Sequence, residues 1–174
     1  MKKILILAFA IPILFSCGKE EKSNENTDII EYNESSPNST TTTTQASQTT
    51  NHIVIKANED MTFDQTKFNV KVGEEITLLL MNNGTSSKEV MGHNAVVLQQ
   101  GVDINGFAFA ASSEKENDYI PKDKISDIII HTKLLGPKEN DQVKFKLENA
   151  GTYDFLCTFP GHAATMRGQI TAVN

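Results

Sequence analysis

The stretch CTFPGHAATM places three side chains that can bind a soft metal ion within ten residues. They are the thiol of Cys157, the imidazole of His162 and the thioether of Met166. Thiolate and thioether ligands suit copper, and imidazole suits copper and zinc. Because Pro160 and Gly161 favour a turn, we expect the segment to curl and its ligands to converge. The spacing therefore predicts a metal site. Without a metal, the alternative is a buried Cys with a surface His and a core Met.

A second imidazole is needed for a trigonal copper site, and the chain has four histidines. His93 is the candidate, because it stands in VMGHNAVVLQ at the start of an apolar strand. The preceding Gly92 permits close approach of another backbone. We expect this position to face the Cys157 loop across a β-sandwich. Two imidazoles, one thiolate and a weak axial thioether are the ligands of blue-copper electron-transfer sites.

The strand GTYDFLCTF predicts that the thiol is buried. Strict alternation places Tyr153, Phe155 and Cys157 on one face, so the cysteine should point inward. A buried thiolate needs a cation beside it. An inward thiol disfavours a hydrolase, which would need an exposed Cys157 and a third group to orient His162. An oxidase or reductase would need an open coordination position or a second copper centre, and four histidines with one free thiol are too few for that.

Short β-branched and aromatic segments between Gly, Asn and Asp turns predict an all-β domain. Eight segments have this character: HIVIKA, KFNVKV, EITLLLMN, NAVVLQ, SDIIIHTK, QVKFKLE, TYDFLCTF and GQITAV. We expect a Greek-key β-sandwich or barrel of about eight strands. Between Gln99 and Pro121, Ala, Glu and Lys replace the alternation, which predicts a short helical insertion.

The N-terminal region predicts export and membrane attachment. Residues 1–16 read as a signal peptide with a Lys pair and a 12-residue apolar run. That run is shorter than the roughly 20 residues of a membrane-spanning helix. LFSC resembles the lipobox of bacterial lipoproteins, which predicts a lipid on Cys17. Residues 17–50 then comprise this cysteine and a disordered tether rich in Ser and Thr, and residues 51–174 form one domain.

Composition narrows the function further. The net charge of −6 and the absence of a Lys/Arg cluster beyond Lys2 and Lys3 argue against a nucleic-acid partner. The chain has two cysteines, and a lipid on Cys17 leaves Cys157 without a disulfide partner in an exported protein. Metal ligation would explain this lone thiol, because a coordinated thiolate is deprotonated and occupied.

The segments VMGHN, IIHTKLLG and CTFPGHAATMRG resemble those of the azurins, bacterial blue-copper proteins of the cupredoxin family. The resemblance covers residues 51–174, which would form an azurin-like cupredoxin domain. It departs from the family at Ala95, where an aromatic residue is usual, and in lacking the cysteines for the usual N-terminal disulfide. It also matches His131 to a position that is not a ligand, so we expect His131 to be a surface or strand-edge residue. His52 is expected at the surface.

The resemblance implies a role for each residue of the site. The equatorial ligands would be His93, Cys157 and His162, with Met166 and the Gly92 carbonyl as axial ligands. Residues beside the ligands would include Asn94, which should tie the two ligand loops together, and Phe159. An exposed edge of His162 would serve as the electron port. Around it, we expect an apolar docking patch for redox partners: Val90, Met91, Phe159, Pro160 and Ala164.

The sequence therefore predicts a membrane-tethered electron carrier with one type 1 copper and no enzymatic activity. We expect a monomer that binds its redox partners transiently, such as cytochromes or copper reductases and oxidases. Its expected location is the cell envelope of a Gram-negative bacterium, lipid-anchored and either periplasmic or surface-exposed. The alternative is a copper carrier or buffer of the envelope, which should have a more open site.

Overall fold

Alternating burial along the strands explains why this sequence forms two packed sheets. The computed structural model describes residues 48–174. In β1 (His52–Ala57) and β3 (Ile76–Asn82), every second side chain is buried, so each strand has one core-facing side. These strands and β6 (Asn140–Phe145) form a three-stranded sheet in the order β1-β3-β6. The pairing of β1 with β3 is parallel, and that of β3 with β6 is antiparallel.

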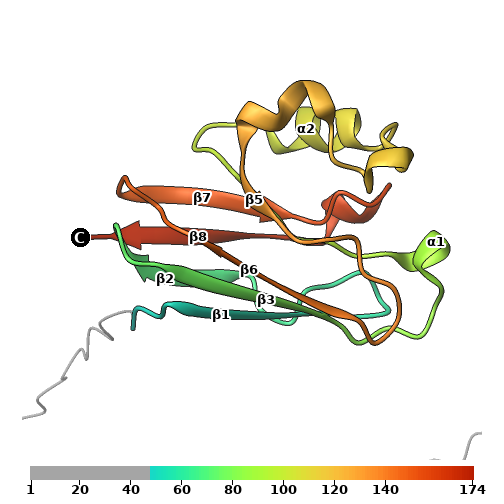
Figure 1. Cartoon of the computed structure of the whole chain (residues 1–174), viewed down its shortest axis with the longest axis horizontal. Coiled ribbons are helices and arrows are strands. Elements are labelled where there is room, and N and C mark those ends of the chain that lie inside the picture. Colours follow the sequence, from blue (N-terminus) through green and yellow to red (C-terminus); the bar gives the residue numbers. More distant parts are fainter. Residues whose placement is uncertain (1–47) are drawn as a thin grey trace, which may run out of the picture. The chain divides into compact units, whose positions relative to one another are not determined.

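The second sheet has five strands in the order β2-β8-β7-β4-β5. Their bounds are β2 (Lys67–Lys71), β8 (Arg167–Val173), β7 (Gly151–Leu156), β4 (Val96–Leu98) and β5 (Ile128–His131). The described residues thus contain eight strands, one at each predicted segment. The prediction of an all-β sandwich of about eight strands is confirmed. Figure 1 shows the arrangement of the strands.

The helices are short and lie in the connections. They are α1 (Lys88–Met91), α2 (Ile104–Ala111) and three 3₁₀ turns, η1 (Lys115–Asn117), η2 (Lys122–Asp127) and η3 (His162–Ala164). The predicted insertion corresponds to α2 and η1. Asp103 caps α2 by accepting hydrogen bonds from the backbone N–H groups of Asn105 and Gly106. None of the helices in residues 48–174 is long and apolar enough to cross a membrane.

Two apolar clusters hold the domain together. The larger one includes buried side chains from both sheets, among them Ile55, Leu78 and Phe155. The smaller one joins Phe107 of α2 to the other face of the five-stranded sheet, including Leu98. Because β4 lies between the two clusters, all three of its residues are buried, which explains its continuous apolar run.

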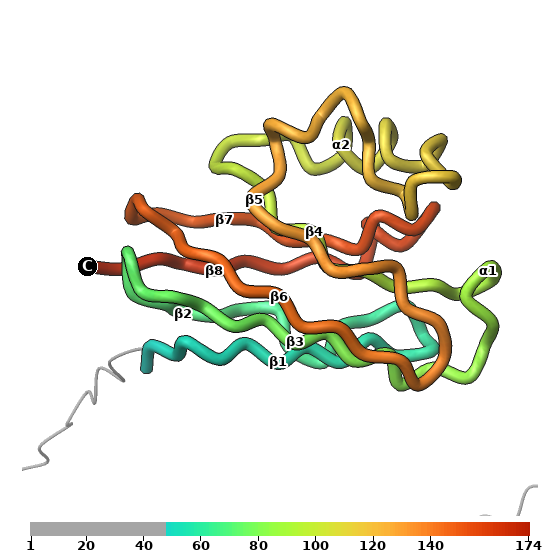
Figure 2. Tube along the Cα trace, in the orientation of Figure 1, coloured from blue at the N-terminus to red at the C-terminus, as the bar shows by residue number. Residues whose placement is uncertain are grey.

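The connections divide between the two ends of the sandwich. The loop after β1, helix α1 and the loop after β7 lie together at one end (Figure 2). The first described residues and the C-terminus lie at the opposite end (Figure 1). The candidate ligands predicted from the sequence belong to the first group of connections, which we call the site end.

Candidate metal centre

Three buried side chains converge at the site end. The donor atoms of His93, Cys157 and His162 all lie within 4.8 Å of one another. The Cys157 Sγ is 3.6 Å from His162 Nδ1, and the two imidazole rings are 5.0 Å apart between centroids. Among residues 48–174, these three are the only cluster of His, Cys, Asp or Glu that could hold a metal ion. The structure thus brings together residues that are 64 positions apart along the chain.

The backbone around His93 is fixed by its neighbour in space. His93 N donates to Leu135 O (3.2 Å), and Leu135 N donates to His93 O (2.7 Å). The preceding Gly92 is buried, and a Cβ there would lie 2.6 Å from Lys88 O and 3.1 Å from Leu134 Cγ. The glycine is needed for this close approach of α1, as the sequence suggested for a backbone contact.

The segment from Cys157 to Met166 curls back on itself. Cys157 N donates to Met166 O (2.9 Å), and Met166 N donates to His162 O (2.8 Å). His162 N in turn donates to Phe159 O (3.0 Å). Gly161 supplies the turn with a φ of +84°, a left-handed conformation that glycine adopts without strain. Both Cys157 and Met166 are fully buried in the larger apolar cluster.

Asn94 joins the two ligand segments. Its Oδ1 accepts from Thr158 N (2.8 Å) and from the Thr158 hydroxyl (3.1 Å), and its Nδ2 donates to Thr158 Oγ1 (2.8 Å). The backbone N–H groups of Asn94 and Phe159 donate to the sulfur of Cys157. These bonds hold the thiol and His93 on a common frame. The sequence had singled out Asn94 but not Thr158, its polar partner next to the cysteine.

Burial sets the protonation states at the site. It raises the pKa of the Cys157 thiol from 9.0 to about 11, against the two backbone donors, which lower it. It also lowers the pKa of His93, and lowers that of His162 to about 4 with help from the nearby His93. Without a metal ion, neutral pH therefore leaves a protonated thiol and two neutral imidazoles.

The arrangement fits a soft metal ion. Both ring nitrogens of His93 are buried without a hydrogen-bond partner. Buried polar atoms in this state are uncommon and point to an absent ligand. A metal ion would coordinate one of them and would replace the thiol proton of Cys157. Two imidazoles and one thiolate match the equatorial donors of a type 1 copper site.

The surface around the site differs from the sequence prediction. His162 is only 2% exposed, so its expected exposed edge is small. The ring of Phe159 packs 4.7 Å from that of His162 and edge-on against Tyr119 at 5.1 Å, which leaves Phe159 9% exposed.

Of the other residues in the predicted docking patch, Val90, Pro160 and Ala164 are exposed and Met91 is half-buried. As expected, His52 and His131 are exposed. Cys17 lies outside the described residues.

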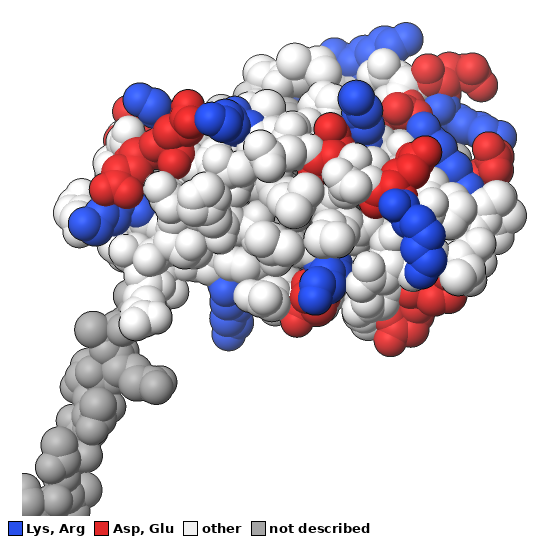
Figure 3. Space-filling view, turned by 60° about the horizontal axis from the view of Figure 1, so that its bottom comes forward, with Lys and Arg blue, Asp and Glu red and all other residues white. Residues whose placement is uncertain are grey.

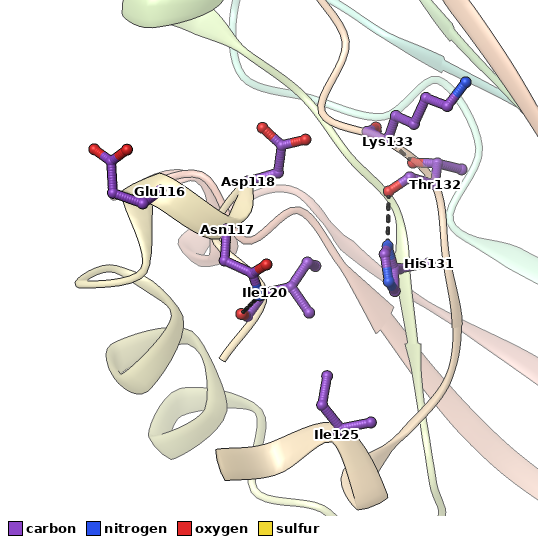
Figure 4. A pocket seen from close by; sticks show the side chains of 8 residues that line it. All are labelled: Glu116, Asn117, Asp118, Ile120, Ile125, His131, Thr132 and Lys133. Atoms are coloured by element: carbon purple, nitrogen blue, oxygen red, sulfur yellow. Dashed lines mark hydrogen bonds between the residues drawn. The ribbon is translucent and has the colours of Figure 1, made fainter. Parts of the chain in front are cut away.

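A cavity of about 390 Å³ lies between the helical insertion and β5. Figure 4 shows Ile120 and Ile125 at this cavity, with His131 at the end of β5. The Nδ1 of His131 is 3.0 Å from Thr132 O. None of the three clustered donors lines this cavity, so it is separate from the candidate metal centre.

Comparison with known proteins agrees with this geometry. Residues 49–173 match the profile of the family described as copper binding proteins, plastocyanin/azurin family. The chain belongs to this family. It is similar to azurin of Pseudomonas aeruginosa, with 40% identity over 125 residues, covering 67% of this chain and 81% of that protein. It is also similar to outer membrane protein H.8 of Neisseria gonorrhoeae, with 35% identity over 124 residues, covering 69% of this chain and 66% of that protein.

Solved structures of blue-copper relatives share the fold. Reduced auracyanin from Roseiflexus castenholzii gives a TM-score of 0.66 at 32% identity and covers 73% of this chain and 100% of its own. Auracyanin A from Chloroflexus aurantiacus, a "blue" copper protein, gives a TM-score of 0.63 at 31% identity, with 70% and 98% coverage. The resemblance to the azurins and the prediction of a cupredoxin fold with a copper cofactor are therefore confirmed.

Proposed function

We propose that this protein carries single electrons through one type 1 copper ion. His93 and His162 would bind the ion through their imidazoles and Cys157 through its thiolate, with the Met166 thioether and the Gly92 carbonyl as weaker ligands. The observation that carries the proposal is the buried cluster of one thiol and two imidazoles in a chain of this copper-binding family. Bound copper would supply a Cu(I)/Cu(II) couple.

The residues of the chain limit rearrangement and water access at this site. Cys157 is 0% exposed, and both histidines are 2% exposed or less. The Asn94–Thr158 bonds and the His93–Leu135 pair fix the donors from two sides. A site whose donors are already fixed changes little when the charge on the metal changes. Small rearrangement favours rapid electron transfer over catalysis, and no open coordination position is required for that role.

Electrons would enter and leave at the site end. Val90 is 64% exposed, and Pro160 and Ala164, which belong to the same proposed docking patch, are exposed as well. Such a small apolar surface suits the transient binding of redox proteins, for which we propose cytochromes or copper reductases and oxidases. On the face seen in Figure 3, acidic and basic side chains are interspersed, and neither sign forms a continuous area.

We place this activity in the bacterial cell envelope, with the protein as a monomer anchored by lipid on Cys17. The LFSC sequence before a Ser- and Thr-rich segment supports the anchor. The similarity to a protein named outer membrane protein H.8 supports the location. The lipid and the tether concern residues outside the structure, and mass spectrometry of the mature N-terminus tests them.

The absorption spectrum of the full chain in detergent, loaded with Cu(II), tests the proposed function. We expect an intense blue colour that bleaches on reduction, because a thiolate-to-copper transition requires Cys157. Cys157→Ser should abolish the colour. Cys17→Ser is the matched control and should keep it. A colourless protein that still binds copper would instead support the copper carrier or buffer.

A further inference from the structure

The loop between β1 and β2 contacts both segments that carry candidate ligands. Its Glu59 accepts hydrogen bonds at Oε2 from the backbone N–H groups of Thr85 (2.6 Å) and Ser86 (3.4 Å), and at Oε1 from the Ser86 hydroxyl. Two residues further on, Met61 O accepts a hydrogen bond from the Thr165 hydroxyl (2.6 Å). One short loop is therefore bonded to the segment before His93 and to the segment that ends at Met166.

A series of close contacts and hydrogen bonds leads from this loop to the backbone of His93. A Cβ at Gly84 would lie 2.7 Å from Glu59 Oε2 and 2.9 Å from Asn82 Oδ1, so the glycine makes room for both groups. Asn82 Oδ1 accepts from Gly84 N (2.8 Å), and Asn82 Nδ2 donates to Leu135 O (3.3 Å). Leu135 forms the backbone pair with His93. Two of these links are hydrogen bonds between the Asn82 side chain and backbone, and the last is the backbone pair of Leu135 with His93.

The position of the His93 ring depends on this backbone. Neither of its nitrogens is hydrogen-bonded, so no hydrogen bond orients the ring. In many metal sites, a partner on the second nitrogen fixes the ring. Here, the neighbouring ring of His162, 5.0 Å away, and the backbone that carries His93 limit where the ring can lie.

Glu59 belongs to the loop after β1, which lies at the site end of the sandwich (Figure 2). None of the three ion pairs in residues 48–174 involves Glu59. The Ser86 hydroxyl and the Thr85 N–H lower the pKa of its carboxyl, so it is ionised at neutral pH. A negative charge at the site end favours the more positive oxidation state of a metal ion held there.

We propose that Glu59 is a positioning residue of the copper site, which holds the segment before His93 through Thr85 and Ser86 and biases the site toward Cu(II). This inference rests on the proposed function. The bias would set the potential at which the protein exchanges electrons.

The test compares Glu59→Gln with Asp60→Asn in the full chain in detergent. The amide of glutamine can accept from the Thr85 and Ser86 N–H groups and donate to the Ser86 hydroxyl, so this variant removes the charge and keeps the shape. Asp60 is the matched control, since it is the next residue, is exposed, and bonds only the Thr62 hydroxyl. At a fixed solution potential, we expect Glu59→Gln to raise the Cu(I):Cu(II) ratio by about two- to fivefold, a size typical of a partly screened charge. Asp60→Asn should change it by less than half as much on a logarithmic scale.

A second measurement needs no copper. In the metal-free protein, Glu59→Ala should increase amide hydrogen exchange at Thr85, Ser86 and His93 by at least about tenfold, while Glu59→Gln restores most of the protection. Unchanged exchange in Glu59→Ala, or equal redox shifts in Glu59→Gln and Asp60→Asn, would overturn the proposal. A failure of the proposed function itself would be recognised separately, because wild-type protein loaded with Cu(II) would then lack the blue colour, whatever its rates of amide hydrogen exchange.

Discussion

The two candidate histidine ligands are held in different ways. His162 Nδ1 lies 3.6 Å from the Cys157 sulfur, whereas neither nitrogen of His93 has a partner. An unsatisfied buried polar group costs about 1–3 kcal/mol. The metal-free fold tolerates this cost because Leu135 fixes the His93 backbone and the ring is fully buried, with the His162 ring 5.0 Å away.

Burial of these groups predicts that the metal-free protein is most stable near neutral pH. The folded pKa of His162 is about 4, below its ordinary 6.5, so stability is lost as pH falls between these values. The folded pKa of Cys157 is about 11, above 9.0, so stability is lost as pH rises between these values. Urea unfolding should show losses of up to about 1.4 kcal/mol per pH unit for each group that titrates, and His93 adds to the loss on the acid side because burial lowers its pKa as well.

Two substitutions test which residues cause the loss of stability at low pH (the acid limb) and at high pH (the alkaline limb). His162→Gln should reduce the slope of the acid limb above about pH 5, where carboxylates contribute little, and the slope that remains should come from His93, whose pKa burial also lowers. Cys157→Ala should flatten the alkaline limb. A metal-free protein whose unfolding free energy is constant from about pH 5 to 10 would contradict the assigned protonation states.

The sequence predicted the clustered donors but not the groups that hold them. Cys, His and Met are rare, and their spacing within one short loop carries information about metal binding. Glu59 and Thr158 are ordinary polar residues, and their partners lie 26 and 64 positions away. Only the packing of the sheets brings such groups together. The near-complete burial of His162 was also missed, because the direction in which the Phe159 ring packs, 4.7 Å from the imidazole, is not visible in the sequence.

At the scale of elements, α1 packs so closely against the segment that leads to His93 that no side chain fits at Gly92. Gly92, which follows α1, has φ −70° and ψ 147°, a conformation open to any residue. The requirement for glycine therefore comes from the nearby Lys88 carbonyl and the Leu134 side chain, and not from backbone strain.

Gly92→Ala should consequently displace α1 from His93. We expect the metal-free protein to lose about 1–3 kcal/mol in its unfolding free energy, as in overpacked cores. Gly136→Ala is the matched control, because its Cβ would make ordinary contacts at 3.4 Å or more. It should change stability by less than about 0.5 kcal/mol in urea titrations. Equal stability of the two variants would show that the contact around Gly92 yields easily.

The strands were predictable because a period of two is visible over five to seven residues. The short helices in the connections were not predictable from the sequence. Helix α1 has four residues, too few to show a helical period, and η2 follows Pro121 beyond the predicted insertion. The strand predicted to reach Phe159 ends at Leu156, because the chain then turns through Pro160 and Gly161.

Over the whole molecule, metal binding should stabilise the fold. The candidate donors flank β4 and β7, which pair within the five-stranded sheet and do not face each other across the sandwich, so the donors meet only when that sheet has formed. A ligand that binds the folded state stabilises it by about 4 kcal/mol at a thousandfold excess over its Kd. We expect Zn(II), which avoids redox chemistry, to raise the unfolding temperature by about 10 °C or more in calorimetry.

Cys157→Ser should remove most of this Zn(II) effect, since it replaces the thiolate with a hydroxyl of similar size. A similar rise in the variant would mean that the metal binds elsewhere on the chain.

The first described residues and the C-terminus lie at one end of the sandwich, and the candidate copper ligands lie at the other. A strand of seven residues spans roughly 23 Å. A membrane anchor attached through the residues before 48 would therefore hold the domain at the end remote from the ligands. The site end of the domain would then remain free to contact redox partners. Because the anchor and the redox partners would act at opposite ends of the domain, they would not compete for the same surface.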